Sequence, residues 1–66
     1  MRYSYNKLWK LLIDKNMKKK DLEAAADIAS STMAKMSKEQ PVHLDVLARI
    51  CKVLEVNIGD ILEIIY

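Results

Sequence analysis

The sequence contains few of the residues that cross-link a small protein or break its helices. Its 66 residues include one cysteine, one glycine, one proline and no phenylalanine. A single cysteine excludes an internal disulfide and fits a reducing cytoplasm. His43 and Cys51 are the only soft metal ligands, too few for a structural zinc site. We therefore expect no metal and no cofactor, and a core held by packing alone.

Sequence features of enzymes and membrane proteins are also missing. The chain has no glycine-rich phosphate loop, and one histidine with one cysteine does not make a convincing catalytic set. The stretch 1–6 is polar, and the apolar residues after it are interrupted by Lys7, Lys10 and Asp14. No run reaches the roughly 20 apolar residues that a membrane span needs. We expect a cytoplasmic protein that is not an enzyme, without a signal peptide or membrane span.

The main pattern in the sequence is the helical spacing of its apolar residues. About half of the residues, 52%, are apolar, and they recur at helical spacing in most of the chain. We predict a single domain over residues 1–66, an all-α, compact five-helix bundle. Its expected helices are Tyr5–Asn16, Lys19–Ala26, Ser30–Met36, Leu44–Leu54 and a short one within Ile58–Ile64.

Several details of this bundle follow from local sequence. Asn16 is expected to end the first helix in a left-handed conformation, and His43 to cap the fourth. Strand propensity at both ends of the chain allows a short pairing of the N- and C-terminal segments. The faces predicted to be buried comprise Tyr5, Leu8, Trp9, Leu11, Leu12, Ile13, Leu22, Ala25, Ala26, Ile28, Met33, Met36, Leu44, Leu47, Ile50, Cys51, Val53 and Leu54.

Charge is unevenly distributed along the chain. Residues 1–40 hold nine basic and five acidic side chains, whereas residues 41–66 hold two basic and four acidic ones. Lys18, Lys19 and Lys20 precede or begin the second helix, where positive charge opposes the helix dipole. A phosphate bound there would explain them, and a solvated lysine run is the alternative.

The third helix has a small polar surface. Met33 and Met36 are expected to point inward, which leaves outward a face made of Ser30, Ser31, Thr32 and Lys35. Short hydroxyls and a lysine can approach base edges in a DNA groove, although Ser and Thr also commonly cap helices. Lys38 and Gln40 in the following loop could reach phosphates.

The C-terminal segment has more apolar residues than one buried helix face needs. They are Ile58, Ile61, Leu62, Ile64 and Ile65. Such a surplus predicts either an intermolecular contact or the closure of the domain's own core.

These features together resemble a known family. The segments YNKLWKLL, MKKKDL, IASST, AKM and VHLDVLARICKVLEVNIGDILEI occur in this order. They resemble the short, single-domain members of the Cro/cI-type helix-turn-helix transcriptional regulators, also called the xenobiotic response element family, whose fold is lambda-repressor-like. The resemblance covers about residues 5–64.

The resemblance implies a sequence-specific regulator of double-stranded DNA whose third helix enters the major groove. Bases would be contacted by Ser30, Ser31, Thr32 and Lys35. Phosphates would be contacted by Lys18, Lys19, Lys20, Lys38 and Gln40. A homodimer, at least on DNA, would form through Ile58, Ile61, Leu62, Ile65 and Tyr66. No membrane and no small-molecule ligand is expected as a partner.

The chain departs from the family pattern at the turn between the second and third helices. Asp27 replaces the usual glycine, and Ala29 replaces the usual Ser or Thr cap. If Ser30 served as the cap instead, the helix would begin one residue later and its outward face would rotate.

Two other functions remain open. The small net charge and apolar C-terminus allow a protein-interaction module of this fold, such as an antirepressor or antitoxin-like partner. The lysine-rich amphipathic stretches allow a small membrane-surface or antimicrobial helix protein, although the core around Cys51 and the acidic second half disfavour it.

Overall fold

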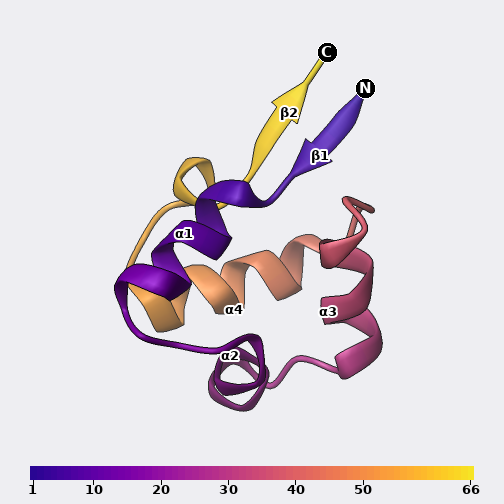
Figure 1. The fold of residues 1–66 in the computed structure, drawn as a ribbon. Helices are drawn as coiled ribbons and strands as arrows, with labels where there is room; N and C mark the ends of the chain where they lie inside the picture. Colours follow the sequence, from indigo (N-terminus) through magenta and orange to yellow (C-terminus); the bar gives the residue numbers. More distant parts are fainter.

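The order of the elements is β1, α1, α2, α3, α4, η1 and β2 (Figure 1). The computed structural model describes residues 1–66. It contains four α-helices, α1 (Asn6–Asp14), α2 (Lys19–Ala26), α3 (Ser30–Ser37) and α4 (Leu44–Leu54). Two short strands, β1 (Arg2–Ser4) and β2 (Glu63–Ile65), and a 3₁₀ turn, η1 (Ile58–Asp60), complete it. α4 crosses the middle of the domain, with the other helices arranged around it (Figure 1).

The C-terminal segment differs from the prediction. Instead of a fifth helix within residues 58–64, the chain makes the three-residue turn η1 and then the strand β2. β2 pairs antiparallel with β1, Tyr3 opposite Ile64, so the predicted pairing of the two ends is confirmed. The five-helix prediction was wrong because a segment too short to be a stable helix holds adjacent β-branched residues, which suit the strand that β1 offers as a partner.

Helix boundaries otherwise lie close to those predicted. α2 and α4 have the predicted bounds, α1 is shorter than the predicted Tyr5–Asn16, and α3 continues one residue further to Ser37. At the start of α1, the buried Ser4 hydroxyl accepts the backbone N–H of Asn6 at 3.3 Å. His43 occupies the N-cap position of α4 but makes no side-chain capping bond, contrary to the prediction.

All four helices end in the same way. A residue other than glycine adopts a left-handed backbone after each of them: Asn16, Asp27, Glu39 and Glu55, with φ of 56°, 55°, 59° and 57°. The next N–H then returns to a carbonyl five residues earlier, for example Ile28 to Glu23 at 2.9 Å and Val56 to Cys51 at 3.0 Å. This is the Schellman arrangement, which satisfies carbonyls left free at a helix end. The left-handed prediction for Asn16 is confirmed.

The core lies between α4 and the elements around it. Thirteen apolar residues are buried, and Leu8, Leu22, Met36, Ile50 and Ile61 are completely so. α4 contributes Val46, Leu47, Ile50 and Leu54.

Three residues predicted to be buried are exposed. Ile13 is 73% exposed and Leu44 68% exposed, and Ala25 also faces solvent. The buried face of α4 is centred near Val46 and Ile50, a rotation that leaves Leu44 outside and Cys51 half-buried. None of the helices combines the length and apolar character that crossing a membrane would require.

Candidate nucleic-acid interface

The turn between α2 and α3 is held from both sides. Asp27 ends α2 in the left-handed conformation, and Ile28 is buried beside it in the core. From α4, Arg49 Nη1 donates a hydrogen bond to the Asp27 carbonyl oxygen at 2.8 Å. The Arg49 guanidinium also lies 3.4 Å from the Asp45 carboxylate on its own helix. The missing glycine is therefore accommodated, and α4 fixes the angle at which α3 leaves the turn.

α3 presents the polar surface that was predicted. Ser30, Ser31 and Lys35 are exposed and Thr32 is half-buried, while Met33 and Met36 pack into the core. The helix begins at Ser30, with Ala29 as an N-cap that makes no side-chain bond. The outward face is therefore not rotated by a later start. Instead of capping the helix, the Ser30 hydroxyl donates to Glu23 Oε1 of α2 at 2.9 Å.

The three lysines at the start of α2 are not equivalent. Lys18 and Lys20 are exposed and make no hydrogen bond through their side chains, and the Lys18 backbone N–H is satisfied by Asp21 at 2.9 Å. Lys19 Nζ, in contrast, lies 4.3 Å from the centre of a Trp9 ring and donates to Ser37 Oγ at 3.0 Å. Lys19 thus connects α1, α2 and the end of α3.

The loop after α3 is tied to the N-terminal segment. Arg2 donates to both carboxylate oxygens of Glu39, at 3.0 and 2.9 Å, and this pairing holds the pKa of Glu39 below its usual range. The buried Tyr5 donates its hydroxyl to the Gln40 carbonyl at 2.9 Å, and burial raises the pKa of Tyr5. Lys38 and the Gln40 side chain remain exposed on this anchored loop.

Sequence reasoning missed the residues that hold this surface in place. Arg2, Trp9, Glu23 and Arg49 act across elements, and nothing in their local sequence indicates their partners. Tyr5 carried a weak signal, because a tyrosine in a buried stripe needs a partner for its hydroxyl.

The residues predicted for a dimer interface do not share one environment. Tyr66 is 99% exposed and Ile58 is also exposed, whereas Leu62 and Ile65 are half-buried. Ile61 has no exposed surface and belongs to the core of its own chain. Its assignment to an interface is corrected, because a completely buried side chain cannot contact a second copy.

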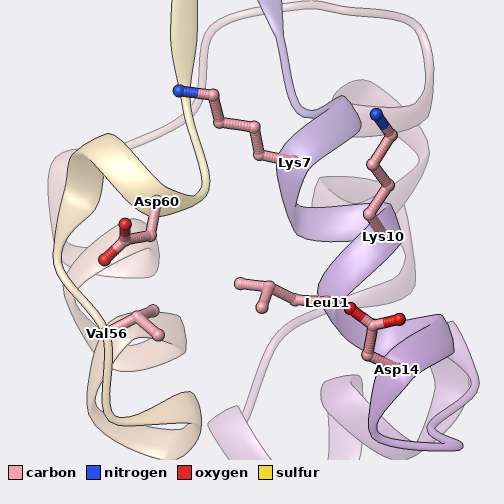
Figure 2. A pocket seen from close by; sticks show the side chains of 6 residues that line it. All are labelled: Lys7, Lys10, Leu11, Asp14, Val56 and Asp60. Carbon is pink, nitrogen blue, oxygen red and sulfur yellow. The ribbon is translucent and has the colours of Figure 1, made fainter.

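A groove lies between α1 and the chain around η1 (Figure 2). It has a volume of about 480 Å³ and is lined by Lys7, Lys10, Leu11, Asp14, Val56 and Asp60. Figure 2 shows Lys7 reaching across it, and its Nζ lies 3.3 Å from the Gly59 carbonyl oxygen. Two lysines and two carboxylates line the groove, so its positive and negative charges are balanced. It does not resemble a site for a polyanion, and none of the predicted contact residues lines it.

Comparison with known proteins adds to this geometry. A family model described as "Cro/C1-type HTH DNA-binding domain" matches residues 7–65. The crystal structure of the transcriptional regulator VanUg is similar, with 53% sequence identity and a TM-score of 0.91, over 94% of this chain and 83% of that one. No curated protein sequence matches.

Proposed function

The chain belongs to the family of Cro/C1-type helix-turn-helix DNA-binding domains, and from this we propose that it regulates transcription by binding specific sequences of double-stranded DNA. Its 53% sequence identity to a transcriptional regulator of known structure supports the proposal. The observation that carries it is the surface of α3, where Ser30, Ser31 and Lys35 are exposed on a helix whose other side is anchored in the core. In a helix-turn-helix, here α2 and α3, the second helix is the one that enters the major groove.

Base recognition is assigned to Ser30, Ser31, Thr32 and Lys35. The exposed hydroxyls are short enough for the helix backbone to approach the groove floor, and Lys35 can donate to guanine O6 or N7. Thr32 is half-buried, and its methyl group is suited to contact with a thymine methyl.

Phosphate contacts are assigned to Lys18, Lys19, Lys20, Lys38 and Gln40. The hydrogen bond from Lys19 to Ser37 supports this grouping, because it brings the start of α2 to the end of α3, directly before Lys38. Lysines from two elements can therefore meet neighbouring phosphates along one strand. Such contacts give affinity and register without reading sequence.

A homodimer would supply the sequence length that one small domain cannot. We assign its interface to apolar residues of the C-terminal segment, namely Ile58, Leu62, Ile65 and Tyr66, with the exposed Ile64 in place of Ile61. Two α3 helices related by a twofold axis would then read half-sites about 34–36 Å apart.

The test begins with selection of bound duplexes from a random pool, followed by anisotropy titrations of the selected site over a range of salt. Lys38→Ala should weaken binding to all sequences and lower the salt slope by about 1. Lys52→Ala, which removes an exposed lysine from α4, is the matched control and should leave the slope unchanged. Lys35→Ala should instead relax the base preference. Failure of micromolar protein to bind any duplex at low salt would overturn the proposal and favour a protein-interaction module.

A further inference from the structure

A carboxylate next to the base-reading face requires an explanation. Glu23 lies in the last turn of α2 and is half-buried, and its Oε1 is 2.9 Å from the hydroxyl of Ser30 at the start of α3. Glu23 makes no ion pair. Near the C-terminal end of a helix a negative charge opposes the helix dipole, and beside DNA it repels phosphates. The hydrogen bond to Ser30 is the contact that its side chain makes in return for these two costs.

The hydrogen bond between Glu23 and Ser30 has a defined direction. An ionised carboxylate only accepts hydrogen bonds, so the single hydroxyl hydrogen of Ser30 is donated to Glu23. The Ser30 oxygen then has only acceptor lone pairs left for another partner. A free serine, in contrast, rotates its hydroxyl and can donate or accept.

We propose that Glu23 makes Ser30 a selective reader of bases that present a hydrogen-bond donor in the major groove. Adenine N6 and cytosine N4 carry such donors, whereas guanine O6 and N7 and thymine O4 are acceptors. Ser30 would accept from adenine or cytosine and be repelled by the acceptors of guanine or thymine. This inference rests on the proposed function, and it assigns Glu23 as a positioning residue that acts through Ser30.

The experiment uses the selected duplex and all of its single base-pair variants, bound to four proteins. These are the wild type, Glu23→Ala, Ser30→Ala and the double variant. Far-UV circular dichroism checks that each is folded. We expect the wild type to prefer one base pair by about fivefold or more at one position, with adenine or cytosine on the strand that Ser30 contacts. Glu23→Ala should bind all duplexes more tightly and lose most of that preference, with no change at other positions.

The double-variant comparison separates the hydrogen bond from the charge. In the Ser30→Ala background, Glu23→Ala still removes the negative charge, but it should not alter the preference at that position further. The inference is overturned if Glu23→Ala keeps the full preference, or if it changes the preference equally without Ser30. If the wild type selects no sequence at all, the proposed function itself fails.

Discussion

Lys19 gives the sharpest test of the structure, because its two neighbours in sequence serve as controls. We expect Lys19→Met to destabilise the domain, since Met keeps the aliphatic stem but loses the ammonium that lies 4.3 Å from the Trp9 ring and 3.0 Å from Ser37 Oγ. Lys18→Met and Lys20→Met remove the same charge from exposed side chains that make no such contact.

The magnitude follows from opposing contributions. An exposed cation–π contact stabilises by about 0.5–1 kcal/mol, and an exposed hydrogen bond from a charged donor by about 1 kcal/mol. Removing a positive charge from the start of α2 stabilises the helix by roughly 0.3–1 kcal/mol, because that charge opposes the helix dipole. The net loss for Lys19→Met is therefore about 1 kcal/mol. In a domain of this size that lowers Tm by roughly 4–8 °C.

Thermal unfolding followed by circular dichroism measures this difference. Lys18→Met and Lys20→Met should match or slightly exceed the wild type, because only the unfavourable interaction with the helix dipole is removed. Trp9 is the only tryptophan, so its fluorescence should also change in Lys19→Met and not in the controls. Equal Tm values for all three variants would refute the bridge between α1, α2 and α3.

Four other variants test the anchors of the fold and the assigned interface. Arg2 lowers the pKa of Glu39, so the ion pair stabilises the fold above the ordinary carboxyl pKa, and this stabilisation is lost as pH falls through the lowered pKa. Glu39→Gln should therefore be less stable than the wild type in urea near pH 7 and approach it in acid, below the ordinary carboxyl range. Burial raises the pKa of Tyr5, so its neutral form stabilises the fold below about pH 10, and this stabilisation is lost as pH rises through the raised pKa. Tyr5→Phe should be less stable than the wild type by about 1 kcal/mol at neutral pH, because the hydroxyl hydrogen bond is gone. Above pH 10 the stability of Tyr5→Phe should fall less than that of the wild type. Ile61→Ala should lose about 2–5 kcal/mol in urea unfolding, whereas Ile58→Ser should alter only self-association in sedimentation, and a fully stable Ile61→Ala variant would contradict the core assignment.

The helices could be predicted from sequence because their signals are local. α2 and α4 were placed at their observed bounds, since apolar spacing and end residues act within a few positions. The end of α2 at Asp27 could also be anticipated, because a short polar side chain tolerates the left-handed backbone.

The C-terminal strand and the contacts of the site could not be predicted in the same way. β2 forms because β1, about sixty residues earlier in the chain, offers it a partner. The exposure of Ile13 and Leu44 depends on which side of each helix the rest of the domain covers, and apolar periodicity defines that side only to within part of a turn. Arg2 with Glu39 and Lys19 with Trp9 are contacts between elements, and only the tertiary arrangement brings them together.

The left-handed residues that end the four helices have an evolutionary consequence. Such a backbone costs a residue other than glycine roughly 1 kcal/mol. The side chain of Glu55, whose φ is 57°, makes no hydrogen bond or ion pair that would offset that cost. Aspartate and glutamate codons become glycine codons by a single nucleotide change, so more stable descendants of this chain lie one mutation away, at Glu55 above all. Because proteins tolerate new substitutions only while they stay above a stability threshold, such a change would let α3 accumulate destabilising replacements. The DNA sequences bound by such descendants would thereby diverge while the fold stays the same.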